Sequence, residues 1–306
     1  MSNISLAKSG ATSIPKRRIA WGRKLFPFIL LLPALLLFAV FTLYPVINGF
    51  IFSFMEWDGF SDGKWVGLSN YITAFHDPFV WQALGHNIQY AVSTVAGKVC
   101  LGLLLAILLN QRLKGISVYR TIIFIPVVLS FVAVGLLWSW IYNPVFGLLN
   151  HFLGLFGFST DTAWLGDPKL ALGALIVVDI WKWAGYHMVL FLAGLQNIPG
   201  DLYEAAKVDG ASRRQSFFRI TLPLMIPIII INTTIAVMGA FNVFDLVYVM
   251  TSAGPYHATE VVMTYSYTQA FKLHSFGYGA AISYLLLFII AVVTAIQLFI
   301  MKRFSH

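Results

Sequence analysis

The chain carries little charge for its length. Only 10% of its 306 residues are charged, whereas a soluble domain carries about 25%. So few charged side chains cannot cover the surface of a water-soluble domain of this size. Hydrophobic residues make up 59% of the chain, and the mean hydropathy is +0.80. This composition excludes an ordinary soluble globular protein and predicts a protein whose main solvent is the lipid bilayer.

Cysteine and the common catalytic motifs are also scarce. The single cysteine, Cys100, lies in an apolar run, which excludes a disulfide framework and a multi-cysteine metal site. The histidines lack metal-ligand spacing, so no metal site is predicted. A Gly-x-x-x-x-Gly-Lys-Ser/Thr phosphate loop is absent, since Gly97-Lys98 is followed by Val99. We therefore expect no ATP-binding site in this chain and no enzymatic activity of its own.

Long apolar runs are what the sequence does contain. A helix needs about 20 mostly apolar residues to cross a bilayer. Six such runs occur, at about 26–50, 87–109, 121–142, 170–195, 222–250 and 277–301. The prediction is an all-α, polytopic membrane protein with six transmembrane helices. We expect residues 1–25 to form an N-terminal tail and residues 26–306 to form the membrane domain.

The basic residues are distributed unevenly between the predicted loops. Fifteen Lys and Arg residues precede the first run, follow the last, or lie in the loops on that same side, and three lie on the opposite side. The positive-inside rule then predicts that both termini are cytoplasmic. The net charge of +8 thus reports membrane orientation, and no nucleic-acid partner is expected.

One substantial cytoplasmic loop is predicted, at residues 196–221. Asp201 suits a helix N-cap, and Glu204 three residues later completes an Asp-x-x-Glu version of the capping box. Gly210 suits the left-handed residue that ends the helix. By the same pattern, Ser212 and Gln215 begin a second short helix that runs to about residue 219. Taken alone, these features describe two helices at the membrane surface that connect two spans.

The same loop contains a longer pattern of fixed positions. Glu204-Ala205-Ala206 is followed by Gly210 and then by Ile220-Thr221-Leu222-Pro223. This arrangement resembles the signature of the permease subunits of binding-protein-dependent ATP-binding-cassette (ABC) importers. The resemblance implies the fold of a type I ABC importer permease.

Further segments resemble the carbohydrate branch of that family, which handles maltose, glycerol phosphate and disaccharides. They include Gly67-Leu68-Ser69-Asn70-Tyr71, Phe191-Leu192-Ala193-Gly194-Leu195-Gln196 and Phe244-Asp245-Leu246-Val247-Tyr248. The resemblance covers nearly all of residues 25–306. It implies a saccharide or related polyol as the transported substrate.

The resemblance also implies partners for this chain. In the family, the Glu-Ala-Ala helix couples the permease to a separate cytoplasmic ATPase. The coupling residues expected here are Glu204, Ala205, Ala206, Asp209 and Gly210. Two ATPase subunits would hold the ATP and magnesium, a second, homologous permease would complete a heterodimer, and an extracytoplasmic binding protein would deliver the substrate. The expected location is the bacterial cytoplasmic membrane.

Polar and aromatic residues follow helical spacing within three of the apolar runs. The three groups are Asn87, Tyr90, Thr94 and Lys98; Asp179, Lys182, Trp183 and Tyr186; and Phe241, Asn242, Phe244, Asp245 and Tyr248. Aromatic faces can stack on sugar C–H surfaces, while amides and carboxylates bond to hydroxyls. We assign Phe241, Asn242, Phe244, Asp245, Tyr248, Trp183 and Tyr186 to a substrate path.

The charges inside the runs have a second interpretation. Asp179 and Lys182 could pair along one helix, and Lys98 could be neutralised by a carboxylate on a neighbouring span. We favour this structural interpretation for all three residues. A different class of protein also remains open, a single-chain secondary transporter that uses Asp179 and Asp245 as ion sites. An intramembrane enzyme is the least supported reading, because neither aspartate lies in a catalytic motif.

Overall fold

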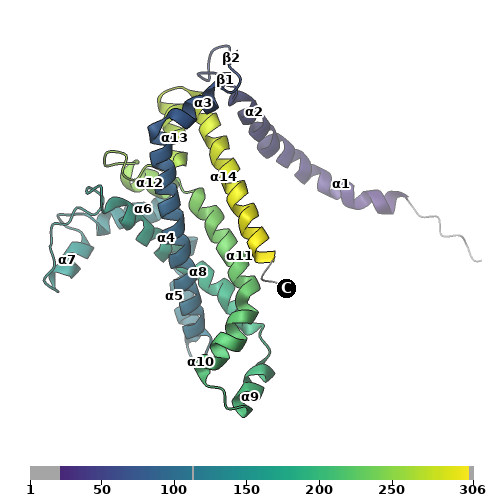
Figure 1. Cartoon of the computed structure of the whole chain (residues 1–306), viewed down its shortest axis with the longest axis vertical. Helices are drawn as coiled ribbons and strands as arrows, with labels where there is room; N and C mark the ends of the chain where they lie inside the picture. Colours follow the sequence, from purple (N-terminus) through teal and green to yellow (C-terminus); the bar gives the residue numbers. More distant parts are fainter. Residues whose placement is uncertain (1–20, 112–113, 303–306) are drawn as a thin grey trace, which may run out of the picture. The chain divides into compact units, whose positions relative to one another are not determined.

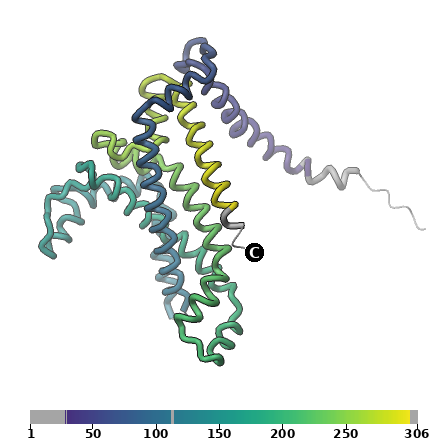
Figure 2. The backbone as a smooth tube through the Cα atoms, in the orientation of Figure 1, coloured from purple at the N-terminus to yellow at the C-terminus, as the bar shows by residue number. Residues whose placement is uncertain are grey.

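The computed structural model describes residues 21–111 and 114–302 (Figures 1 and 2). Residues 1–20 of the predicted tail lie outside this description. The chain divides into two compact units, one up to Gly49 and one from Phe50 onward. The first contains α1 (Trp21–Phe38), the π-helical turn η1 (Ala39–Leu43) and most of α2 (Tyr44–Phe52). Within these helices, Leu30–Phe52 is long and apolar enough to cross a membrane.

The second unit is a bundle of long helices. They are α4 (Pro78–Leu109), α8 (Ala171–Gln196), α11 (Leu222–Phe241) and α14 (Phe276–Lys302). Glycines let α8 approach its neighbours closely. A Cβ on Gly185 would lie 2.2 Å from the Ile123 carbonyl oxygen, and one on Gly102 would lie 3.1 Å from the backbone of His187. Small residues at such contacts are how membrane helices pack without a hydrophobic driving force between them.

Short elements lie at both ends of this bundle (Figure 1). At one end, which we call the strand end, β1 (Met55–Glu56) pairs antiparallel with β2 (Lys64–Trp65) beside α3 (Ser69–His76). At the other, the α9 end, lie α9 (Gly200–Val208) and α10 (Arg213–Ser216). Further short elements are α7 (Leu148–Gly154), α12 (Asp245–Thr251), α13 (Val262–Tyr267) and the π-helical turn η3 (Thr268–Lys272).

The third predicted span is broken, which corrects the expectation of one helix over 121–142. α5 (Ile116–Val128) and α6 (Phe131–Ile141) meet at 101°. Pro126 lies inside α5 and removes a backbone donor there. Ser130 then starts α6, because its hydroxyl accepts a bond from the Ala133 N–H at 3.2 Å. Among the described residues, five helices could cross a membrane, or six if this bent pair is one span.

The fifth predicted span differs at both ends from the expected range of 222–250. Helix α10, the π-helical turn η2 (Phe217–Thr221) and α11 run on without a gap, so one candidate span covers Arg213–Phe241. The second surface helix expected to end near residue 219 is therefore the start of this span. At the other end the helix stops at Phe241, and α12 begins only at Asp245.

Candidate functional site

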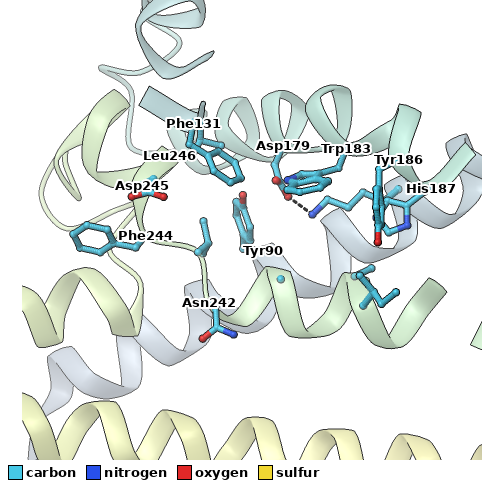
Figure 3. Close-up of a pocket in the computed structure, with 15 residues that line it drawn as sticks. Tyr90, Phe131, Asp179, Trp183, Tyr186, His187, Asn242, Phe244, Asp245 and Leu246 are labelled. Atoms are coloured by element: carbon cyan, nitrogen blue, oxygen red, sulfur yellow. Dashed lines mark ion pairs between the residues drawn. The ribbon is translucent and has the colours of Figure 1, made fainter. Parts of the chain in front are cut away.

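A buried ion pair joins α4 to α8. The Lys98 Nζ lies 2.5 Å from the Asp179 Oδ2, and each side chain is only 4% exposed (Figure 3). A single charge buried away from water costs several kcal/mol, so each of these residues depends on the other. This confirms the prediction that a carboxylate on a neighbouring span neutralises Lys98.

Lys182 has a different partner from the one expected. The predicted pair with Asp179 is wrong, because the Lys182 ammonium group donates hydrogen bonds to backbone carbonyls where α5 ends. The acceptors are the carbonyl oxygens of Leu129 at 2.7 Å, Val127 at 3.2 Å and Pro126 at 3.3 Å. The last carbonyls of a helix have no partner within it and attract positive charge. Lys182 thus stabilises the break between α5 and α6.

A cavity of about 280 Å³ adjoins the ion pair. Its walls come from α4, α6, α8, α11, α12 and the segment between α11 and α12 (Figure 3). Five of the seven residues assigned to a substrate path line it: Trp183, Tyr186, Asn242, Phe244 and Asp245. The other two do not. Phe241 is buried in the core at 6% exposure, and Tyr248 stacks on Phe244 with ring centroids 5.3 Å apart.

The interruption after α11 places polar groups at this cavity. Asn242 and Asp245 flank the break, and both are exposed. A continuous helix, as the sequence predicted here, would have kept Phe241 and Asp245 on one face. The signal that could have found the break is Gly239 followed by Asn242, because both residue types are poor helix formers.

Some lining residues escaped the sequence-based assignment. Tyr90 was placed on a polar stripe but not in the path; its side chain is buried and lines the cavity. Its hydroxyl has no hydrogen-bond partner among the described residues. His187 also lines the cavity and bonds to the buried Asn232. Within residues 21–111 and 114–302, no three His, Cys, Asp or Glu side chains could hold a metal ion together.

The loop between α8 and α11 presents α9 on the surface. Helix α9 begins at Gly200 with Pro199 as its N-cap, so the expectation that Asp201 caps it is wrong. Asp201 instead lies in the first turn, where a carboxylate interacts favourably with the helix dipole. The expected left-handed residue is confirmed, since Gly210 has φ 76°.

No residue of α9 is buried. Of the expected coupling residues, Glu204, Ala205, Asp209 and Gly210 are exposed and Ala206 is half-buried. The structure thus gathers all five on one exposed turn-and-helix segment.

A capping box follows this segment, and one hydrogen bond attaches the segment to the bundle. The capping box predicted after it is confirmed: the Ser212 hydroxyl accepts from the Gln215 N–H at 3.3 Å, and the Gln215 side chain accepts from the Ser212 N–H at 2.7 Å. The hydroxyls of Tyr203 and Thr221 lie 2.8 Å apart and connect α9 to the following span. The exposed helix therefore has a defined attachment to that span.

Comparisons with known proteins agree on one family. Residues 98–306 match a family described as "Binding-protein-dependent transport system inner membrane component". A probable ABC transporter permease of Bacillus subtilis, YurN, is 39% identical over 279 residues, which cover 90% of this chain and 95% of that protein. The trehalose/maltose transport permease MalF of Thermococcus litoralis is 36% identical over 272 residues, covering 89% and 92%.

Solved structures share the fold. A chain of a bacterial ABC transporter that imports the acidic polysaccharide alginate matches with a TM-score of 0.82 at 24% identity, covering 93% of this chain and 97% of that one. A second structure of an alginate transporter is in complex with a periplasmic protein bound to an alginate pentasaccharide. It matches with a TM-score of 0.80, also at 24% identity, over 90% and 93% of the two chains.

Proposed function

This chain belongs to the inner membrane components of binding-protein-dependent transport systems, and we propose that it carries a saccharide or related polyol across the membrane as one subunit of an ATP-driven importer. The family resemblance and the all-α fold predicted from the sequence are both confirmed. A permease subunit is not an enzyme, as expected. Relatives named for trehalose and maltose or for lactose support a saccharide substrate.

The lining of the cavity is the observation that supports this substrate best. Trp183, Tyr186 and Phe244 offer aromatic rings, which stack on the C–H faces of sugars. Asn242 and Asp245 offer an amide and a carboxylate, which bond to hydroxyls. Aromatic walls with a few placed polar groups are typical of small-molecule sites.

Helix α9 is the proposed entry point for the driving force. Its exposed Ala205 leaves the helix backbone open to close approach by another surface. Two ATPase subunits that hold ATP and magnesium would dock there, and a second, homologous permease would complete the path. ATP binding would move the coupling helices together and turn the cavity outward, and hydrolysis would reset it. The binding protein would dock on the opposite side, at the strand end.

The location proposed for the chain follows from the same arrangement. The complex would lie in the bacterial cytoplasmic membrane, with α9 and both termini on the cytoplasmic side. A single-chain transporter driven by ions is less well supported, because Asp179 is already paired with Lys98. Vanadate should abolish uptake by the assembled importer, whereas an ionophore should abolish uptake by an ion-driven carrier.

Asp245→Ala tests the cavity in the complete complex reconstituted in proteoliposomes. We expect sugar-stimulated ATP hydrolysis to fall about tenfold, because a hydrogen bond to a charged group contributes roughly 1.5–3 kcal/mol. Asp167→Ala is the matched control, since the Asp167 side chain accepts a bond from the Lys169 N–H at 2.8 Å and does not line the cavity. Unchanged stimulation in Asp245→Ala would remove this residue from the path.

A further inference from the structure

Aromatic rings continue from the cavity in an unbroken row, which we call the aromatic ladder. It consists of Phe244, Tyr248, Tyr267, Phe271, Phe276 and Trp57. Successive ring centroids are 5.3, 5.3, 5.1, 5.1 and 5.7 Å apart. The ladder thus connects α12, α13, η3, the start of α14 and the loop that carries the two strands.

Each end of the ladder opens on a hollow. Phe244 lines the 280 Å³ cavity, and Figure 3 shows its ring directed away from Tyr90. Trp57 lines a second, wider hollow of about 640 Å³ at the strand end, together with Asp58 and Asn70. The row of rings therefore joins the proposed sugar site to a polar basin on the side where a sugar would arrive.

The ladder is partly accessible. Phe271 is 56% exposed, and the other five side chains are half-buried. All but Phe276 lie outside the helices that are long and apolar enough to cross a membrane. Polar groups accompany them: the Lys272 Nζ lies 5.5 Å from the Tyr248 ring centroid, and Asp245 follows Phe244. Exposed aromatic surface bordered by polar groups marks a binding surface.

The size of the cavity indicates what the ladder binds. A volume of about 280 Å³ is at the lower end of the range for small-molecule pockets. It suits a short sugar, and the further units of a longer chain would extend beyond it. The rings stack on one another or meet at an angle, so a sugar chain along the ladder would contact their exposed edges and outer faces.

We propose that the aromatic ladder is a second sugar-binding surface, which holds the units of an oligosaccharide that extend beyond the cavity toward the strand end. The proposal rests on the proposed function, because it assumes that the cavity takes the first units. It adds a chain-length preference that resides in this subunit: longer saccharides use the ladder and disaccharides do not depend on it.

The test compares the uptake of a short and a longer saccharide by the reconstituted complex. The malto-, cello- and arabino-oligosaccharide series are first offered to the wild-type complex with its binding protein, and the series that stimulates ATP hydrolysis most is used. Initial uptake is then measured at saturating, sugar-loaded binding protein for the disaccharide and the tetrasaccharide. The rate ratio between the two lengths cancels any general loss of activity.

Phe271→Ala should lower the ratio of tetrasaccharide to disaccharide uptake about tenfold, and Phe271→Trp should restore it. The matched control is Phe158→Ala, which removes a similarly exposed ring outside the ladder; Phe158 is 65% exposed and Phe271 is 56% exposed. An unchanged ratio in Phe271→Ala, or an equal loss for both lengths, would overturn the proposal, as would a wild type that takes up only disaccharides. If no series stimulated the wild-type complex, the proposed function itself would fail.

Discussion

Helix α9 and the ion pair beside the cavity differ in the burial of their side chains. No side chain of α9 is buried, and a hydrogen bond between Tyr203 and Thr221 attaches it to the bundle. At the cavity, Tyr90 and the ion pair of Lys98 and Asp179 are buried between helices that are distant in sequence. Substitutions in α9 should therefore impair contact with a partner, whereas substitutions at the ion pair should impair folding of the chain itself.

The ion pair offers the largest expected effect. Asp179→Ala leaves Lys98 charged and unpaired at 4% exposure, which should destabilise the chain by about 3–5 kcal/mol. The double variant Lys98→Met with Asp179→Leu should recover most of that loss, because apolar residues can replace a buried pair. Unfolding of the purified chain in mixed detergent micelles measures both. An Asp179→Ala variant as stable as the wild type would show that the pair contributes nothing.

Substitutions at the expected coupling residues should reduce transport without impairing folding. Proline requires φ near −65°, whereas Gly210 has φ 76°, so Gly210→Pro should distort the turn after α9. Glu204→Lys reverses the charge of the exposed carboxylate. We expect either change to lower uptake about 30-fold or more, since an unmatched charge or turn at an interface costs about 2 kcal/mol or more. Membrane insertion should be normal.

Gly115→Pro is the matched control for the backbone effect. Gly115 has φ 81° and open space around it, as Gly210 does, but it lies before α5 and outside the α9 segment. Uptake should fall much less in this variant. Full uptake by Gly210→Pro and Glu204→Lys would contradict the coupling role of α9.

Lys182→Met should loosen the break between α5 and α6. The Val127 and Leu129 carbonyls lose the Lys182 donor, whereas the Pro126 carbonyl keeps its bond from the Leu129 N–H at 3.3 Å. An unsatisfied buried acceptor costs about 1–3 kcal/mol. Hydrogen exchange of the amides in residues 128–134 should become faster. Lys169→Met, which alters an exposed lysine, should leave the exchange there unchanged. The same protection in both variants would show that Lys182 does not support the break.

Low pH is expected to have a smaller effect, on the local stability of the fold at the strand end. Asp77 accepts hydrogen bonds from Tyr265 at 2.5 Å and Tyr278 at 2.7 Å. Burial acts to raise the pKa of Asp77, but hydrogen bonds from the two tyrosines and from the Phe79 and Val80 N–H groups outweigh it, and the pKa is lowered from 3.8. A lowered pKa stabilises the fold above the unfolded value, and this contribution is lost as the pH falls through the folded value.

The protection of amides in residues 262–280 against hydrogen exchange should therefore decrease below pH 3.8 in the wild type. In the Asp77→Asn variant, the protection of these amides should already be reduced at neutral pH and should change little in acid. A wild type and an Asp77→Asn variant with the same pH dependence would rule out this carboxylate as the cause.

Sequence patterns predicted the features that depend on residues close in the chain and those that the cost of a buried charge requires. The capping box at Ser212 and the left-handed Gly210 depend on residues close in the chain, so short motifs revealed them. That Lys98 has a carboxylate partner on a neighbouring span followed from the cost of an unpaired charge, but the sequence did not identify Asp179 as that partner. The breaks after Val128 and Phe241 did not follow, because both lie within apolar runs and hydropathy does not report bending. Lys182 reaches acceptors more than fifty residues away, which helical spacing alone cannot reveal.

The most direct measurement concerns the partner of α9. A photo-reactive amino acid at Ala205, which is exposed on α9, should cross-link to the ATPase subunit in the assembled, transport-competent complex, with a yield that changes when ATP is bound. The same group at Phe60, 84% exposed at the strand end, should not reach the ATPase. Cross-links from Ala205 to the substrate-binding protein, or to lipid alone, would contradict the account.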